Sequence, residues 1–321
     1  MNIYSTLMDL NTRNGVAPAI NSEIEQLIIK LINSNCFYYS EIDEIKNKLI
    51  NKLIEYRKHN KINCVVIGMS GGIDSAVTAA LFKQAEYRVI GVTMPIHQNS
   101  AETVRGVEAC AQLDIEHMNI DLSSIYDSLV QFYQDQDVDF NTELVGDQMR
   151  DQQIRKGNLR ARLRMITLYN LANKHKGFVA STDNFSELAA GFWTLHGDVG
   201  DVAPIQSLTK SWEVPRLAQA LGVPESILRA TPTDGLGIAN GDEDQFGFSY
   251  LEFDAVLLAL LNGVGFSPSN SDTKQLVAEV KKRIGSTSFK RANPYNLDHP
   301  IDRSARFDEL NRYDSISNNR S

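Results

Sequence analysis

The sequence predicts an α/β protein with a doubly wound parallel sheet flanked by helices. Short apolar segments typical of strands alternate with longer segments of helical periodicity. The strand segments are apolar at successive positions, which indicates strands that helices cover on both faces. The predicted strands are 64–68, 89–92, 117–120 and 178–180, and the predicted helices between them are about 74–86, 101–113 and 147–174.

Two amphipathic helices are predicted before the first strand. One has apolar residues at 24, 27, 28, 31 and 32 on one face, and a capping box from Ser22 to Glu25 would open it. The other fits residues 41–58. The apolar faces at 24–32 and 42–54 need partners, so these helices are expected to cover the sheet or to form a homodimer interface.

Three regions follow from this pattern. Residues 1–60 form an N-terminal arm and helices, and within them residues 1–20 show no periodicity and are expected to be a loosely held arm. Residues 61–293 form the α/β domain. Residues 294–321 form a C-terminal tail that is expected to be poorly ordered.

The composition favours a globular protein without a membrane or nucleic-acid partner. Hydrophobic residues make up 42% of the 321-residue chain, yet no apolar run approaches the roughly 20 residues of a membrane span. The N-terminus lacks signal-peptide order, so a cytoplasmic location is expected. A net charge of −8 disfavours nucleic acid. The isolated thiols argue against a disulfide framework or a zinc site, and they are Cys36, Cys64 and Cys110.

One segment departs from this acidic background. Positive charge is concentrated between residues 155 and 164, which favours a site for a small anionic ligand rather than a duplex. The residues are Arg155, Lys156, Arg160, Arg162 and Arg164.

The strongest motif is a glycine- and serine-rich loop between the first predicted strand and a helix. Glycines let successive amides point inward around phosphate oxygens, and the helix N-terminus adds partial positive charge. The loop lacks the lysine of a Walker motif and the GxGxxG spacing of a dinucleotide fingerprint. Its residues are Gly68, Met69, Ser70, Gly71, Gly72, Ile73, Asp74 and Ser75.

Further polar segments follow later strands and helices. Asn158, Arg162 and Met165 share one helix face within KGNLRARLRM. Thr182 and Glu187 lie in STDNFSE, after a strand, where open α/β sheets bind ligands. Helix capping is the simpler role for Thr182 and Asp183, but capping would not be expected to use a carboxylate as far along as Glu187.

The SGGxDS loop resembles that of the N-type ATP pyrophosphatases, which split ATP between the α and β phosphates. From about residue 40 to 291 the chain is similar to the NAD synthetases. This resemblance implies that ATP adenylates deamido-NAD and that ammonia then gives NAD, with Mg²⁺ as cofactor. About sixty residues precede the first strand, too few for an amidase domain, so free ammonia or a separate donor protein is expected.

The same resemblance assigns roles to residues. Asp74 and Glu187 would bind Mg²⁺, and with Lys210 they would form the catalytic set. The loop from Gly68 to Ser75, Thr182, Lys210 and Thr233 would bind ATP. The substrate side would use Asn158, Arg162, Asp201, Lys290 and Arg291, and the segment Phe289–Arg291 would come from a partner subunit of a homodimer.

Several substrate-side positions depart from the family pattern. Leu195 stands where a lysine is usual, Thr93 replaces an arginine, and Phe289 replaces a histidine. Adenylation is therefore better supported than the identity of the acid. Two alternatives stay open, namely an ATP pyrophosphatase that adenylates another carboxylate and a noncatalytic nucleotide sensor.

Overall fold

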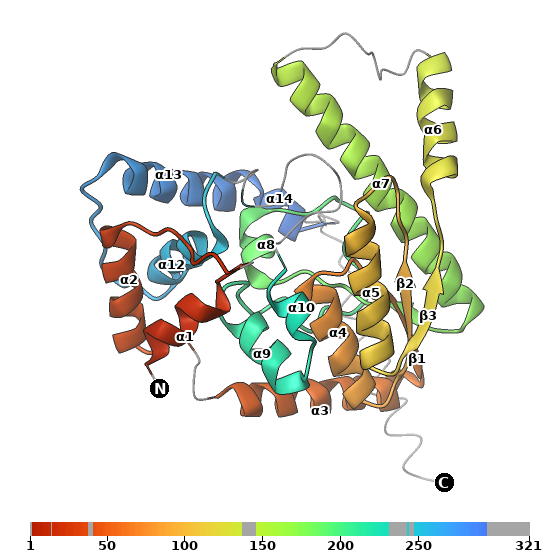
Figure 1. The fold of residues 1–321 in the computed structure, drawn as a ribbon, viewed down its shortest axis with the longest axis horizontal. Coiled ribbons are helices and arrows are strands. Elements are labelled where there is room, and N and C mark those ends of the chain that lie inside the picture. Colours follow the sequence, from red (N-terminus) through yellow and green to blue (C-terminus); the bar gives the residue numbers. More distant parts are fainter. Residues whose placement is uncertain are drawn as a thin grey trace, which may run out of the picture.

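The computed structural model has a parallel β-sheet with helices on both faces (Figure 1). The strands are β1 (Cys64–Gly68), β2 (Arg88–Thr93), β3 (Glu116–Asn119) and β4 (Phe178–Val179). Within the part of the chain that the structure describes, their order is β3-β2-β1-β4 and every pairing is parallel. The predicted fold class is confirmed. The described residues are 2–13, 15–37, 41–136, 146–230, 243 and 247–293.

The helices match the predicted segments closely around the sheet and add several after it. None of the described helices is long and apolar enough to cross a membrane. Up to the last strand they are α1 (Ile3–Leu10), α2 (Ser22–Asn33), α3 (Ile42–Asn60), α4 (Ile73–Gln84), α5 (Ser100–Gln112), α6 (Ser123–Asp135) and α7 (Asp147–Lys174). After β4 they are α8 (Phe185–Ala190), α9 (Glu213–Leu221), α10 (Glu225–Leu228), α12 (Tyr250–Leu261), α13 (Ser271–Ser286) and α14 (Ser288–Arg291).

Successive residues of β1 point to opposite faces of the sheet, and each face has its own core. Val65 and Ile67 pack with α3, α4 and α9, whereas Cys64 and Val66 pack against α7. This explains the continuous apolar run in the sequence, since both faces of the strand are buried. β3 behaves differently because it lies at the edge of the sheet, and most of its residues are exposed. The prediction that it is buried on both faces was wrong.

A third core lies beside the sheet and is made by helices. α1, α2, α8, α12 and α13 contribute to it, and they gather on one side of the molecule (Figure 1). The prediction of a loosely held arm over residues 1–20 was wrong, because Leu7 and Leu10 of α1 are buried here. α2 begins as predicted, but its cap is the Asn21 side chain, which accepts from the amides of Glu23 and Ile24.

The apolar faces of α2 and α3 are therefore covered within the chain itself. Ile24, Leu27, Ile28 and Leu31 are buried in the helical core, and Ile42 and Leu53 lie in the core under the sheet. Covering the sheet was one of the two roles expected for these helices, and α3 fills it. The argument for a homodimer from these faces is lost, because they already have partners.

The connections create a switch point in the sheet. The chain runs from β1 to β2 and β3 on one side, and then returns to place β4 on the other side of β1. Ile67 pairs with Gly91 and Val66 with Val179, so the carboxyl ends of these strands lie along one edge. Ligands of open α/β sheets bind at such a point, outside the carboxyl ends of the strands.

Candidate active site

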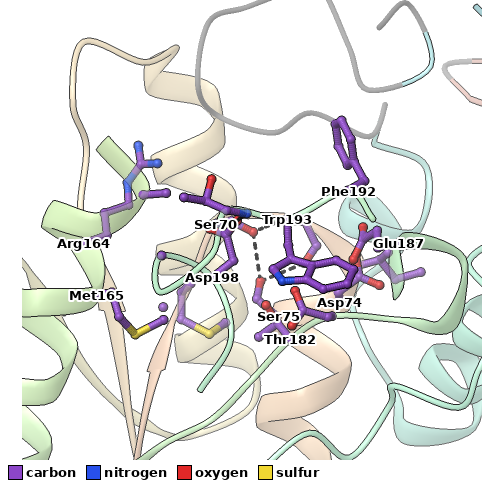
Figure 2. A pocket seen from close by; sticks show the side chains of 18 of the residues that line it. Ser70, Asp74, Ser75, Arg164, Met165, Thr182, Glu187, Phe192, Trp193 and Asp198 are labelled. Atoms are coloured by element: carbon purple, nitrogen blue, oxygen red, sulfur yellow. Dashed lines mark hydrogen bonds between the residues drawn. The ribbon is translucent and has the colours of Figure 1, made fainter. Parts of the chain in front are cut away.

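The loop between β1 and α4 lies at this switch point. Gly71 has a φ of +83°, and a Cβ there would lie 2.2 Å from the carbonyl oxygen of Glu102, so this position requires glycine. The Ser70 hydroxyl accepts from the Gly72 amide at 3.2 Å and lies 3.2 Å from the Ser75 hydroxyl. Figure 2 shows these serines beside Asp74. The loop therefore collects amide and hydroxyl donors at a helix N-terminus, where an anion is stabilised.

Lys210 lies between two carboxylates that come from different helices. Its Nζ donates to Oδ2 of Asp74 and, at 3.3 Å, to Oε1 of Glu187. The Asp74 and Glu187 side chains are each only 14% exposed, so these ion pairs are less screened than surface pairs. Asn184 donates to the other oxygen of Asp74 at 3.2 Å. The Asp74 carboxylate is thus fixed through both of its oxygens.

The backbone around Lys210 is anchored by α8 and α12. The Lys210 amide donates to the Ser186 hydroxyl at 2.9 Å, and the Ser211 amide donates to Asp254 at 3.0 Å. The Lys210 ammonium also lies 5.4 Å from the centre of the Tyr250 ring, within cation–π range. These contacts position the lysine before any ligand arrives.

Glu187 combines a capping role with its ion pair. It is the third residue of α8, and it forms a capping box with Asn184 in which each side chain bonds the backbone amide of the other. The expectation that capping would not use this carboxylate was wrong, because the cap is Asn184 rather than Thr182 or Asp183. Oε2 of Glu187 makes the cap and Oε1 meets Lys210.

A cavity of about 580 Å³ opens over the loop and the Lys210 cluster, within the usual range for small-ligand sites. Arg164 and Met165 lie on one side of it and Glu187 and Phe192 on the other (Figure 2). The structure brings most of the predicted site residues to this one cavity. They are Gly68, Met69, Ser70, Gly72, Ile73, Asp74, Ser75, Asn158, Thr182, Glu187, Lys210 and Lys290.

Two predicted substrate residues are engaged elsewhere and do not line the cavity. Arg162 is exposed, and its Nε donates to the carbonyl of Leu195 at 3.2 Å. Asp201 accepts from the Val179 amide at 2.9 Å and from the Tyr169 hydroxyl at 2.8 Å, so it ties its loop to the end of β4. Thr233, predicted to bind ATP, lies outside the described residues.

Of the two basic residues predicted to bind substrate after α13, Lys290 lines the cavity and Arg291 does not. Lys290 lines the cavity of its own chain and donates to the carbonyls of Gly191 and Trp193 at 2.6 and 2.5 Å. A partner subunit is not needed to bring it there, contrary to the expectation. Arg291 instead donates to the carbonyls of Leu188 and Ala189 and so caps the end of α8.

The positions that depart from the family pattern lie outside the cavity wall. Thr93 is buried, and its hydroxyl contacts Asn119 at 2.8 Å and His117 at 3.0 Å. Phe289 is 60% exposed. The cluster of positive charge on α7 also contributes less than predicted. Of its five members, only Arg164 lines the cavity. The Arg160 guanidinium instead lies over the Tyr126 ring.

Two carboxylates in the cavity, the buried Asp183 and the half-buried Asp198, were not among the predicted site residues. Asp198 accepts from the Thr194 amide at 2.6 Å, and Asp183 accepts from the Ser181 hydroxyl at 2.7 Å. Burial raises the pKa of both, that of Asp183 to about 6. Asp183 stands inside the STDNFSE motif, so a signal was present, but nothing in the pattern shows that this side chain is buried.

A further buried carboxylate, Glu213, leads to a prediction on pH. It begins α9, and it accepts from the amide and hydroxyl of Thr209, while burial raises its pKa to about 7. A carboxyl whose pKa is raised in the folded state contributes stability below its unfolded pKa near 4.5, and that stability is lost as pH rises toward 7. Between pH 5 and pH 8, we expect the free energy of unfolding of Glu213→Gln to rise by about 2 kcal/mol relative to that of the wild type.

Urea unfolding at pH 5, 6, 7 and 8 measures this difference. Glu55→Gln is the matched control, because Glu55 is exposed in α3 and makes only a surface pair with Lys52. Its stability relative to wild type should stay constant with pH. A Glu213→Gln curve parallel to that of wild type would show that Glu213 is already ionised in the folded protein.

The fold and the loop together define a class of protein. A strand, an SGGxDS loop and a helix at the switch point of a parallel sheet, with Asp74, Glu187 and Lys210 beside them, make a nucleotide-binding enzyme of the ATP pyrophosphatase type. The family model described as NAD synthase matches residues 45–294. The chain belongs to the NAD synthase family.

Similar proteins agree with this placement. The NH(3)-dependent NAD(+) synthetase of Alkaliphilus oremlandii is 36% identical over 65% of this chain and 84% of its own length. That of Finegoldia magna is 32% identical over 79% and 94%. Among solved structures, NMN synthetase from Francisella tularensis has a TM-score of 0.67 with 27% identity, covering 81% of this chain and 99% of its own. The NH3-dependent NAD synthetase of Campylobacter jejuni has a TM-score of 0.61 with 30% identity, covering 80% and 99%.

Proposed function

We propose that this chain is a carbon–nitrogen ligase that converts deamido-NAD to NAD, using ATP and ammonia and releasing AMP and pyrophosphate. The observation that carries the proposal is the cluster of Asp74, Glu187 and Lys210 beside the phosphate loop in one cavity. Relatives that align over most of their length are named NH(3)-dependent NAD(+) synthetases.

In the first step the nicotinate carboxylate attacks the α-phosphorus of ATP and pyrophosphate leaves. The amides and hydroxyls of the loop from Gly68 to Ser75 would hold the leaving pyrophosphate. Lys210 would offset the charge that develops between the α and β phosphates, since it is fixed in place before the reaction. These groups bind and neutralise, and no protein nucleophile is required.

The residues present fit a magnesium site. Asp74 and Glu187 both reach the Lys210 ammonium, so their oxygens converge on one cationic position. Mg²⁺ is usually held by one or two carboxylates together with substrate phosphates and water. Bound there, the ion would neutralise phosphate charge and polarise the phosphorus–oxygen bonds.

In the second step ammonia displaces AMP from the adenylated carboxyl group. The acid side of the substrate would lie against α7 and the segment from Gly191 to Asp198, because residues of both line the same cavity as the phosphate loop. Asn158 and Lys290 are the predicted substrate residues that reach this wall. Arg162, Asp201 and Arg291 would need to move to meet a ligand, so we assign them no contact.

A second candidate substrate deserves a direct comparison. Nearly the whole of the solved NMN synthetase aligns with this chain. Nicotinic acid mononucleotide is therefore the alternative acid. The family resemblance puts the departures at Leu195 and Phe289 on the substrate side, but neither residue lines the cavity, so they do not decide between the two acids.

The test is product formation with each acid. We would incubate the full chain with ATP, Mg²⁺ and ammonium, with either deamido-NAD or nicotinic acid mononucleotide, and replace ammonium by glutamine in a parallel set. NAD formed from deamido-NAD and ammonium supports the proposal. Faster amidation of the mononucleotide would move the assignment to NMN formation. ATP binding without product from either acid would favour a nucleotide sensor.

A homodimer and a cytoplasmic location remain proposals. α6 and the N-terminal half of α7 project from the sheet (Figure 1), and they carry exposed apolar side chains that a second copy could cover. These are Ile125, Phe132, Met149 and Ile154. Light scattering of the purified chain would distinguish a dimer from a monomer.

A further inference from the structure

The N-terminal segment brings an arginine into the cavity from outside the region that the family model matches. That region begins at residue 45, whereas Arg13 follows α1 and lines the cavity together with the phosphate loop. α1 is held by its buried residues Leu7 and Leu10, and the Asn11 side chain donates to the carbonyl of Ser211 at 2.9 Å. The segment is therefore fixed against the body of the protein next to Lys210.

The Arg13 side chain is held at the cavity wall by backbone carbonyls. Its Nη1 donates to the carbonyls of Leu10 and, at 3.2 Å, of Leu228. Leu228 also lines the cavity, beside Ile227 at the end of α10. Because both carbonyls are bonded to the same nitrogen, the planar guanidinium keeps other donors for a ligand, in the fork geometry that suits phosphate.

Arg13 lines the same cavity as Asp74 of the phosphate loop, and the two charges interact. Burial lowers the pKa of Arg13, and the carboxylates of Glu243 and Asp74 act in the opposite direction while Arg229 adds to the lowering. Among the described residues, no carboxylate lies within ion-pair distance of Arg13. Arg13 is half-buried, and an anionic ligand would offset the cost of holding its charge partly away from water.

A comparison with Arg229 separates ligand binding from simple tethering. Arg229 also joins the N-terminal segment to α10, through the Asp9 carbonyl, the Asp9 carboxylate and Glu225. It does not line the cavity, and its charge is met by these carboxylates. Arg229 therefore tethers α1 to α10 without facing the cavity, whereas Arg13 faces the cavity.

We propose that Arg13 is an ATP-binding residue that contacts the β and γ phosphates and then the leaving pyrophosphate. The ligand class follows from the guanidinium geometry and from the neighbouring loop, which collects donors for the same anion. This inference rests on the proposed use of ATP. Arg13 would supply a phosphate contact from the N-terminal segment, in addition to the contacts made by the region that the family model matches.

Titration calorimetry with Arg13→Gln tests it, using ATP with Mg²⁺, inorganic pyrophosphate and AMP as ligands. Losing a charge-assisted hydrogen bond to phosphate should weaken ATP and pyrophosphate binding by about 10- to 100-fold. AMP affinity should stay within about twofold, because AMP lacks the β and γ phosphates. Arg13→Lys should restore part of the loss, since it keeps the charge without the fork.

Arg229→Gln is the matched control, because it removes from the end of α10 an arginine that tethers the same N-terminal segment. It should leave all three affinities near wild type even if its melting temperature falls. The inference is overturned if Arg13→Gln binds ATP as wild type does, or if it loses ATP and AMP affinity equally. Wild-type protein that binds no ATP would instead refute the proposed function, so the two failures are distinguishable.

Discussion

Replacing Asp74 by Asn should reduce pyrophosphate release by about 10³-fold or more. Asp74 is the carboxylate that meets both Lys210 and Asn184, and it stands in the phosphate loop where the proposed magnesium ion and the phosphates converge. The amide oxygen can still accept from Asn184, so the fold should be kept. What is lost is the negative charge that holds a metal ion and orients Lys210.

Steady-state pyrophosphate release with deamido-NAD, ATP and ammonium measures this loss. Asp114→Asn makes the same chemical change in an exposed ion pair with Lys83 and should leave the rate unchanged. Higher Mg²⁺ should not restore the Asp74→Asn rate fully, because the lysine is also misplaced. A rate within tenfold of wild type would show that Asp74 does not bind the reacting metal ion.

Replacing Lys210 by Met should lower kcat by about 10²- to 10³-fold. Methionine fills much of the same volume but cannot donate to Asp74, Glu187 or phosphate oxygens. The effect should fall mainly on kcat, because charge on the bridging oxygen grows in the transition state. The anchors of its backbone on Ser186 and Asp254 stay in place, so the loss reports on the ammonium.

Single-turnover measurements with saturating ATP separate this loss from weaker binding. Lys83→Met, in a half-exposed surface pair, is the control. A Lys210→Met enzyme that changes KM for ATP but retains its kcat would mean that the lysine only binds the ground state. Lys210 would then have to be removed from the catalytic set.

The elements around the sheet could be predicted because their signals are local. A run of apolar residues at Cys64–Gly68 can be buried on both faces only in a strand covered by helices, and the loop that follows has glycines and serines in a spacing few other structures need. The predicted loop, Lys210, Glu187 and Thr182 accordingly come together in one cavity.

The predictions that were wrong depend on contacts between segments that lie far apart in the sequence, which no local pattern contains. The burial of α1 depends on a helical core built from α2, α12 and α13, so its short apolar set looked unpartnered in sequence. Asp201 and Asp198 are equally plausible acids three residues apart, and only the structure shows that Asp201 bonds the Val179 amide while Asp198 faces the cavity. Arg13 carries no motif, and its position depends on its own bond to Leu228 and on the bond of Asn11 to Ser211, both far along the chain.

The most direct test of adenylation at this site is exchange of labelled pyrophosphate into ATP in the absence of ammonia. The proposed reaction forms an adenylated carboxyl group and pyrophosphate before nitrogen is needed. Deamido-NAD with Mg²⁺ should therefore support exchange, which Asp74→Asn should abolish. Exchange that requires ammonia, or none with deamido-NAD while the enzyme still forms NAD, would contradict a separate adenylation step.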